Sequence, residues 1–455
     1  MSMMDWTKLL QPLRVGETST RHEDGRSPFH KDQDRIIFSS AFRRLDRKTQ
    51  VHPLSENDHV HNRLTHSLEV SCVGRSLGFR VAEGLKANNS SFPESITPGD
   101  VGAILQAACL AHDIGNPPYG HTGEDAIRHW FLDSQNAFLL DGLSDLEKAD
   151  LRSFEGNAQG FRLVTQVEYH RFSGGMRLTQ ATLGTFLKYP WTVEHASASG
   201  AKANKFGCFQ SEFSILKSIA SDLGLIPQGV NSKGMTNKWC RHPLVYLMEI
   251  ADDICYGLID LEDGIEMGIL RYSEVEAILK PLLADEWHRY EVDFNSADNE
   301  RRRLSMLRGK AMEKMVVAVS QAFLDNETEL LAGTLVGELS DHCPDVVRDV
   351  INNAKSLARE RIFKDPRKTA IEVGAYSTLA NLLTAFLEAA KELIETGRST
   401  YRNSRVLEMM GPSAPQADWT LYQAYMRVLD YVAGMTDNYA ADTAQQFSGY
   451  SPPGR

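Results

Sequence analysis

The chain has 455 residues, which is enough for one large domain or for two or three of average size. Hydrophobic residues make up 42% and charged residues 24%, so we expect a globular protein with a sizeable core. The net charge of -11 argues against a surface that binds nucleic acid throughout, although it leaves room for a local basic cleft.

The distribution of cysteine and apolar residues indicates a cytoplasmic protein. The six cysteines are scattered without a CxxC pair, which is typical of reduced thiols in a cytosol. Residues 1–11 are too short and too polar for a secretory signal. No run approaches the roughly 18 apolar residues of a membrane span, so we expect no membrane association.

In chain order, the first candidate feature is a basic cluster that precedes a short alternating stretch at residues 49–52. This stretch is the only sequence hint of a strand. The cluster lies beside Gln50 and consists of Arg43, Arg44, Arg47 and Lys48. For each of these cations, a solvated helix end and a direct phosphate contact are about equally favoured.

Most of the chain has helical rather than alternating periodicity. One apolar stripe recurs at i, i+3, i+4 and i+7 and ends before Gly115, with Ile104, Ala107, Ala108 and Ala111 as its residues. Three further segments predict amphipathic helices, at 243–258, 304–324 and 377–395. Loops are expected at 86–99, 134–144 and 195–207. We therefore predict an all-α fold, with one large helical domain that continues into a helical C-terminal part.

The strongest chemical signal is the adjacent pair His112 and Asp113 at the end of the first predicted helix. His66 and Asp252 each lie on another amphipathic segment that can border the same core. Two imidazoles and two carboxylates suit a divalent first-row metal, and the lack of cysteine ligands argues against structural zinc. Any one of the fourteen histidines is more often structural, but this ordered set favours a metal centre that keeps positions free for water and phosphate.

Two further spacings point to side chains around this centre. His121 and Glu124 are three residues apart, so on a helix the carboxylate can fix the tautomer of a proton-transferring imidazole. Asp252, Tyr256 and Asp260 are four residues apart and share one helical face. The structural alternatives are a helix-capping histidine with a solvated glutamate, a core tyrosine and a surface aspartate.

These residues lie within passages that resemble a known family. The order of the four candidate ligands resembles the HD superfamily, and the flanking text resembles the deoxyguanosinetriphosphate triphosphohydrolase (dGTPase) family. The resemblance rests on seven passages in family order: DRIIFSSAFRRLDRKTQV (34–51), HNRLTHSLEV (61–70), AHDIGNPPYGHTGE (111–124), FEGNAQGFR (154–162), LTQATLGTFLKYPW (178–191), EIADDICYGLIDLEDGI (249–265) and DYVAGMTDNYA (430–440).

The resemblance implies an HD-domain helical bundle core with additional C-terminal helices. Residues 1–60 would be an N-terminal segment packed on the core, 61–275 the HD phosphohydrolase domain, and 276–455 a helical C-terminal region continuous with it. The implied reaction is metal-dependent hydrolysis of dGTP, or of dNTPs generally, to deoxynucleoside and inorganic triphosphate. The cofactor would be Mn²⁺, Mg²⁺ or another first-row divalent ion. Partners would be a dNTP substrate, further copies of the chain in a homo-oligomer such as a hexamer, and a dNTP or single-stranded DNA effector.

The resemblance also implies a role for each candidate residue. The metal ligands would be His66, His112, Asp113 and Asp252, with Asp252 favoured over Asp253. His121 would be catalytic at the α-phosphate, with Glu124 as its orienting partner. Substrate contacts would come from Gln50 and Val51 at the sugar, Arg63 and Lys188 at the phosphates, and Tyr256 and Asp260 at the sugar. Glu155, Asn157 and Gln159 would line the same cavity without an assigned role.

Two departures and two alternatives remain open. Asn116 and Gly156 stand where more distant HD relatives often have histidine, which leaves the proton path undecided. The first alternative is another HD phosphohydrolase, a nucleotidase or phosphodiesterase, which would keep the four ligands without needing passages 43–51 and 154–159. The second is a non-catalytic nucleotide-sensing or nucleic-acid-binding scaffold, which would have no need for an intact ligand set and His121.

Overall fold

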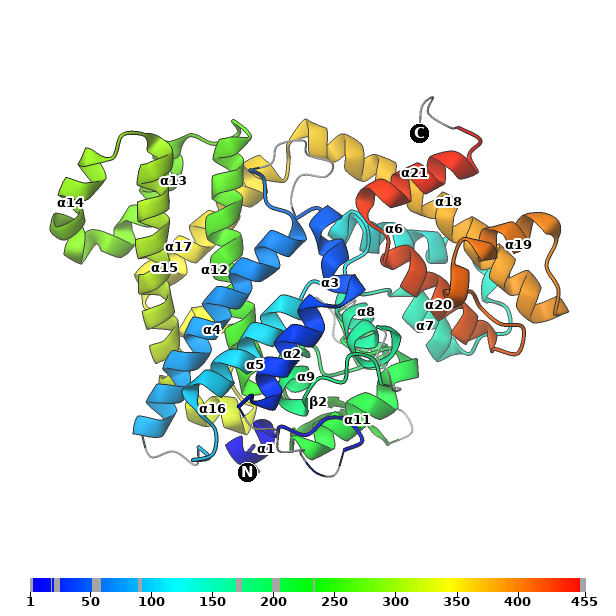
Figure 1. Ribbon diagram of the computed structural model, residues 1–455, viewed down its shortest axis with the longest axis horizontal. Helices are drawn as coiled ribbons and strands as arrows, with labels where there is room; N and C mark the ends of the chain where they lie inside the picture. The colour runs from blue at the N-terminus through cyan, green and yellow to red at the C-terminus, as the bar shows by residue number, and fades with distance from the viewer. Residues whose placement is uncertain are drawn as a thin grey trace.

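The computed structural model describes residues 3–17, 19, 25–50, 59–88, 92–168, 174–198, 205–231 and 234–450. Within these ranges the chain forms helices α1 to α21 and one two-stranded antiparallel sheet, so the predicted all-α class is confirmed (Figure 1). The helices group around two hydrophobic cores that lie side by side in the molecule.

The first core holds the helices that carry the candidate metal ligands. Its main members are α2 (Pro28–Ile37), α4 (Arg63–Ala87), α5 (Pro98–Ala111), α9 (Gln180–Phe186), α12 (Pro243–Glu266) and α15 (Glu300–Asp325). Leu77 of α4, Leu105 of α5 and Leu247 of α12 are completely buried where these helices meet. Burying such side chains contributes about 1.5–3 kcal/mol each, so the three ligand-bearing helices are held on a rigid base.

The second core joins the segment after the His112–Asp113 pair to the C-terminal part of the chain. It is built from α6 (Gly120–Leu132), α7 (Asp145–Arg152), α8 (Gly156–Arg162), α18 (Pro366–Thr396), α20 (Leu421–Ala433) and α21 (Asp437–Phe447). In Figure 1 the long helix α18 runs from the first core to the second. By length and composition α18 could cross a membrane, but Leu379, Leu382 and Phe386 are fully buried in this core, which accounts for its apolar character.

The remaining elements complete the two cores and their edges. The helices are α1 (Trp6–Leu9), α3 (Ser40–Arg44), α10 (Val193–Ala198), α11 (Phe213–Asp222), α13 (Tyr272–Leu279), α14 (Trp287–Ser296), α16 (Glu327–Ala332), α17 (Asp345–Leu357) and α19 (Tyr401–Glu408). Two π-helical turns occur at Leu163–Val167 and Ala358–Ile362. The hairpin pairs β1 (Pro227–Val230) with β2 (Thr236–Trp239).

The structure differs from the sequence predictions at the connections. The expected loop at 134–144 contains a 3₁₀ helix, Ser134–Leu140, and the β1–β2 hairpin was not predicted. β1 is short and mostly exposed, and it includes Pro227 and Gly229, so it lacks the alternation that marks a strand. Of the short stretch predicted at 49–52, Thr49 forms a bridge with Asn62, and residues 51–58 lie outside the described ranges.

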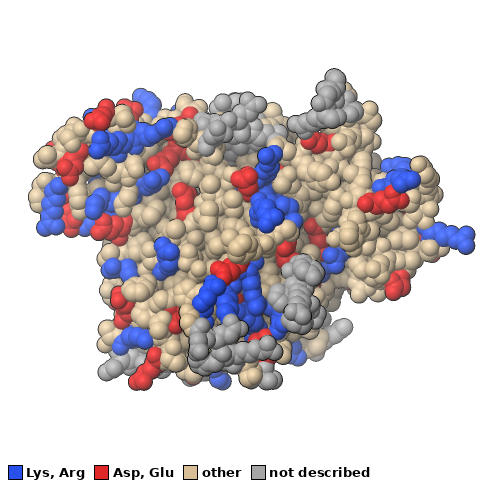
Figure 2. All heavy atoms as spheres, viewed as in Figure 1, with Lys and Arg blue, Asp and Glu red and all other residues tan. Residues whose placement is uncertain are grey.

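The surface charge is distributed unevenly. Figure 2 shows acidic and basic side chains interspersed over the projection formed by α13 to α15. On the same face a group of basic side chains gathers near the centre of the molecule. A chain with a net charge of -11 therefore still presents a locally basic surface.

Candidate active site

Helix α4 places His66 one turn after its first residue. The helix begins with a reciprocal cap, in which Thr65 N donates to Asn62 Oδ1 at 3.0 Å and Asn62 N donates to Thr65 Oγ1 at 3.1 Å. Such a cap satisfies two of the backbone N–H groups that a helix start leaves unpaired. The start of α4 is thereby fixed, and the His66 side chain is 1% exposed against the first core.

Helix α5 ends at the predicted pair of ligands. His112 follows Ala111 directly, and its Nδ1 lies 2.6 Å from the Cys109 carbonyl oxygen. This hydrogen bond places the proton on Nδ1 and leaves the lone pair of Nε2 for a metal, which is how metal-binding histidines are commonly oriented. Residue 115, four positions after the end of α5, has to be glycine because α8 passes close by: a Cβ there would lie 2.1 Å from the Gly156 carbonyl oxygen.

Three of the four predicted ligands converge on one point. Asp252, in the middle of α12, brings its Oδ1 within 3.0 Å of His66 Nε2 and 3.6 Å of His112 Nε2. The three ligand atoms all lie within 4.8 Å of one another, close enough to hold a single ion. The mixed nitrogen and oxygen donors fit a divalent first-row metal.

Asp113 lies beside this cluster but makes other contacts. Its Oδ1 is 3.7 Å from His112 Nε2, while its oxygens accept hydrogen bonds from Arg63 Nη1 and Asn116 Nδ2, each at 2.5 Å. Asp113 would have to turn one oxygen toward the ion to complete a set of four. Asn116, the position that differs from distant HD relatives, holds the carboxylate of Asp113 as an amide donor.

The cluster is strongly coupled through charge. Burial lowers the pKa of His112, but the negative charges of Asp113 and Asp252 outweigh it and raise that pKa to about 9. Burial raises the pKa of Asp252, but the His112 charge and hydrogen bonds from both imidazoles hold it well below its usual value. Both imidazoles must be neutral to bind a metal, so binding competes with the proton on His112.

His121 and Glu124 meet at the start of α6, as their spacing predicts. Tyr119 has a φ of 64° and Gly120 a φ of 57°, so two left-handed residues turn the chain into the helix. His121 Nδ1 lies 3.1 Å from Glu124 Oε2, and the His121 side chain is 79% exposed whereas that of Glu124 is 2% exposed. The imidazole is therefore exposed to solvent, while the carboxylate that holds it is buried.

Glu124 is held as an ionised acceptor. Burial raises its pKa, but the His121 hydrogen bond and the charge of Lys205 outweigh it and lower the pKa to about 2. Its Oε1 accepts from Gly156 N at 2.8 Å. A Cβ at Gly156 would come within 2.5 Å of that oxygen, so the Glu124 carboxylate fills the space that a side chain at position 156 would need.

The structure separates the residues that were expected to line the cavity without an assigned role. Glu155 caps α8 and pairs with Lys205 at 2.6 Å, beside Glu124. Gln159 instead donates to Asp430 in the second core at 2.9 Å, away from the metal cluster. Lys205 was not singled out from the sequence, because a lysine in a polar loop gives no sign of its buried partners.

The predicted substrate contacts fall into three groups. Arg63 is buried against Asp113, and Lys188 lies 3.4 Å from Glu249. Gln50 has a buried Oε1 without a partner among the described residues, and Val51 lies outside them. The third group, Tyr256 and Asp260, is on α12. Burial is the main cause that raises the pKa of Tyr256, and the charges of Asp260 and Asp252 raise it further.

Asp260 is the most unusual of these residues. It is 1% exposed, and neither carboxylate oxygen has a hydrogen-bond partner among the described residues. Burial raises the pKa of Asp260 well above its usual value, and the charges of Asp263 and Asp252 add to the effect. A buried carboxyl without a hydrogen-bond partner lowers the stability of the fold, so Asp260 is a candidate for pairing with a ligand.

Two residues far apart in the sequence brace residues 112–119, which connect α5 to α6, carry two of the predicted ligands and are called the catalytic loop below. Asp437, the first residue of α21, accepts hydrogen bonds from Tyr119 N and Thr49 N, each at 2.9 Å, and from Thr49 Oγ1. Lys48 is buried and donates to the carbonyl oxygens of Asn116 (2.6 Å) and Ala433 (2.7 Å). Asp437 and Lys48 are here called the clamp. Lys48 is therefore neither at a solvated helix end nor free to face solvent: it is a buried donor to two backbone carbonyls.

Comparison with known proteins identifies the family. Residues 63–196 match the HD domain, and residues 342–446 match the phosphohydrolase-associated domain. The deoxyguanosinetriphosphate triphosphohydrolase-like protein of Pseudomonas aeruginosa is 54% identical over 451 residues, which cover 99% of this chain and 100% of the relative. A protein with the same description from Synechocystis is 39% identical and covers 98% of this chain and 100% of the relative.

A relative whose description carries no "-like" also matches. The deoxyguanosinetriphosphate triphosphohydrolase of Salmonella arizonae is 30% identical over 491 residues, which cover 93% of this chain and 94% of the relative. These full-length matches agree with the HD-domain match and with the converging His66, His112 and Asp252. The chain therefore belongs to the deoxyguanosinetriphosphate triphosphohydrolase family of HD-domain phosphohydrolases.

Proposed function

We propose that this protein hydrolyses deoxynucleoside triphosphates, dGTP or dNTPs generally, to deoxynucleoside and inorganic triphosphate. The observation that carries the proposal is the meeting of His66, His112 and Asp252 within 4.8 Å, next to the buried pair Arg63–Asp113. A divalent ion, Mn²⁺ or Mg²⁺ in our proposal, would polarise a phosphate oxygen there and activate water. Asp113 would be the fourth ligand.

The residues around the ion would bind the substrate and move a proton. Arg63 pairs with Asp113 beside the cluster and would exchange this carboxylate for a phosphate oxygen of the substrate, since guanidinium groups pair with either anion. Lys188 is the second proposed phosphate contact. His121 would exchange a proton with the reacting group at the α-phosphate, and ionised Glu124 would hold its tautomer through Nδ1. The exposed position of His121 allows an incoming substrate to reach it.

The sugar would lie along α12. Tyr256 and Asp260 follow Asp252 at intervals of four residues, so they lie one above another within about 12 Å of axial rise. We propose that Tyr256 packs against the deoxyribose and that Asp260 pairs with its 3′-hydroxyl. Gln50 and Val51 would be further sugar contacts. Among the described residues, neither Asp260 nor Gln50 Oε1 has a hydrogen-bond partner, which supports the assignments of Asp260 and Gln50.

Product analysis tests the proposal. The protein is incubated with Mn²⁺ or Mg²⁺ and each dNTP or NTP, and the phosphorus products are separated by ion exchange. We expect inorganic triphosphate and deoxynucleoside in equal amounts from at least one dNTP. Diphosphate or orthophosphate would instead identify another HD phosphohydrolase. No turnover with any nucleotide would favour the non-catalytic scaffold.

The remaining proposals concern the protein's setting. We infer a cytoplasmic enzyme that works as a homo-oligomer, a hexamer by resemblance, with a dNTP or single-stranded DNA as effector. Light scattering after gel filtration measures the oligomer mass directly. Turnover of each dNTP with a second dNTP or an oligonucleotide added shows whether either acts as an effector.

A further inference from the structure

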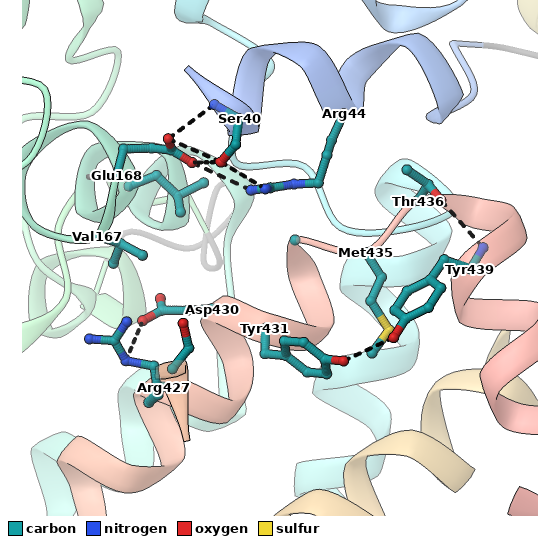
Figure 3. Close-up of a pocket in the computed structure, with 13 residues that line it drawn as sticks. Ser40, Arg44, Val167, Glu168, Arg427, Asp430, Tyr431, Met435, Thr436 and Tyr439 are labelled. Carbon is teal, nitrogen blue, oxygen red and sulfur yellow. Dashed lines mark hydrogen bonds and ion pairs between the residues drawn. The ribbon is translucent and has the colours of Figure 1, made fainter. Parts of the chain in front are cut away.

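A cavity lies in the seam between the two cores, and none of the residues that line it belongs to the metal cluster. It measures about 430 Å³ and opens between α3, the π-helical turn Leu163–Val167 and the junction of α20 with α21 (Figure 3). None of its lining residues is a proposed metal ligand, catalytic residue or sugar contact, and only Arg44 was weighed above as a phosphate contact. Two passages that supported the family resemblance, 34–51 and 430–440, meet in its wall, and the proposed reaction gives their side chains here no task.

The two acids that line the cavity already have their donors. Glu168 accepts hydrogen bonds from Ser40 N, Ser40 Oγ and Ala41 N at 2.9–3.2 Å. Asp430 accepts from Arg162 Nε at 2.8 Å, Arg162 Nη2 at 2.9 Å and Gln159 Nε2 at 2.9 Å. The Asp430 charge is therefore balanced by Arg162, which does not line the cavity, whereas Glu168 is held by neutral donors and by Arg44 at 3.5 Å.

The two guanidinium groups in the wall are less well satisfied. Arg44 donates to Ser40 Oγ at 3.0 Å but stays 3.5 Å from Glu168. Arg427 stays 3.9 Å from Asp430, because Arg162 occupies that carboxylate. The Nε atoms of Arg44 and Arg427 are both buried without an acceptor among the described residues. Buried donors without acceptors are rare, because each loses its hydrogen bond to water without gaining another.

The rest of the wall is aromatic and apolar. Figure 3 shows the Tyr431 and Tyr439 side chains on the side opposite Val167, with their hydroxyl groups paired at 3.1 Å. Met435 lies beside them. The cavity thus combines unsatisfied cationic donors with a surface suited to a flat or aliphatic body.

We propose that this cavity binds a small organic anion, whose phosphate or carboxylate accepts hydrogen bonds from Arg44 and Arg427 while its apolar part packs on Tyr431 and Met435. A guanidinium group presents a planar set of N–H donors that matches either anion. The cavity volume lies within the range of about 300–1,000 Å³ that is usual for small-molecule sites.

An occupant would also contact the segment that leads to Asp437 of the clamp. Gly434, Met435 and Thr436 line the cavity, and they connect Ala433, whose carbonyl accepts from Lys48, to Asp437, which accepts from Tyr119 N. Ordering these three residues would therefore restrain Tyr119 and Asn116. This regulatory consequence rests on the proposed function, whereas binding itself does not.

Binding is measured by calorimetry in the presence of EDTA, without nucleotide. Phenyl phosphate and benzoate are the probes, and neutral benzyl alcohol is the matched control. We expect one saturable site for at least one of the two anions and none for the alcohol. The stronger anion tells whether the cavity prefers phosphate or carboxylate. Arg44→Gln and Arg427→Gln should each weaken binding by roughly tenfold or more, the loss expected for a charge-assisted hydrogen bond.

Two control variants and one mapping experiment locate the site. Arg43→Gln changes an exposed neighbour on the same helix and His66→Ala removes a proposed metal ligand, and both should bind the anion like wild type. Hydrogen exchange should show ligand-dependent protection of residues 427–440. Absence of binding, equal affinity in all variants, or loss of binding in His66→Ala alone would overturn the proposal. Because no turnover is measured, failure of the dNTPase assignment leaves this result unaffected.

Discussion

Asp113 shows how a predicted ligand can be near a metal cluster and still have other partners. We predict that Asp113→Ala or His66→Ala loses both bound metal and activity, because an incomplete shell binds a divalent ion weakly. Metal content is measured by atomic emission after gel filtration. His30→Ala, at an exposed histidine, serves as the control. If Asp113→Ala keeps its metal while His66→Ala does not, Asp113 anchors Arg63 and the site has three protein ligands.

His121 is expected to act on the substrate rather than on the metal. His121→Ala should keep its metal and its substrate affinity, while kcat falls by roughly two to four orders of magnitude, the range for loss of a general acid or base. Asp125→Asn, at an exposed carboxylate one residue from Glu124, is the matched control and should be active. Loss of metal in His121→Ala would make the residue a ligand or a structural element.

Asp260 is expected to recognise the sugar. Asp260→Ala should raise KM for a dNTP and cost about 1–3 kcal/mol, because the buried 3′-hydroxyl would lose its hydrogen-bond partner. A 3′-deoxy analogue cannot form the bond, so steady-state kinetics should show similar values for wild type and variant. Equal losses with both substrates would show that Asp260 supports the fold.

The same carboxyl makes a prediction about pH. Its pKa is higher in the folded than in the unfolded chain, so the folded state holds a proton that the unfolded state releases. Stability is therefore lost as pH rises above the unfolded value of about 4. Asp260→Asn removes this cost. Its unfolding free energy in urea, relative to wild type, should increase from about pH 5 to about pH 8, and a pH-independent difference would contradict the assignment.

At the scale of elements, the clamp ties the start of α21 to the catalytic loop. Asp437→Ala leaves the N–H groups of Tyr119 and Thr49 without their acceptor, at a cost of about 1–3 kcal/mol each where water cannot enter. We expect lower kcat and a lower Tm with unchanged metal content. Asn438→Ala, at the exposed next residue, should match wild type in all three measurements. Normal kcat in Asp437→Ala would show that the loop does not need the clamp.

The positions of helices were largely predictable, whereas their full lengths and their partners were not: α12 extends to Glu266 and α18 begins at Pro366. The apolar spacing at 243–258 and 304–324 predicted α12 and α15, because burial of one face requires that period. The same reasoning brought His121 to Glu124, since three residues separate them. Thr49 and Asp437 are 388 positions apart, and no local pattern links them. Lys48 looked like one of four surface cations until the carbonyl groups that surround it were known.

At the scale of the whole molecule, the two matched families do not correspond to two independent cores. α6 to α8 lie within the segment matching the HD domain, yet they pack with α18, α20 and α21 from the region around the phosphohydrolase-associated domain. Helical periodicity shows which face of a helix is buried but not against which helix, so this arrangement could not be read from the sequence.

This interleaving predicts that the chain does not divide. A chain ending at residue 341 should aggregate or lack a stable fold, because it exposes Ile127, Phe131 and Phe154 of the second core. The full chain should lose hydrogen-exchange protection in α4 and α20 at the same urea concentration. A soluble 1–341 fragment with native protection in α6 would contradict this expectation.

The position of Asp437 near the end of the chain has a consequence for biosynthesis. The ribosome releases residues in order, so His66, His112 and Asp252 emerge long before the residue that braces the loop beside them. A nascent or prematurely terminated chain can carry every proposed ligand and still lack the support of Tyr119. If the proposed function holds, the full rate of hydrolysis would be reached only after Asp437 has been synthesised and has folded against Tyr119.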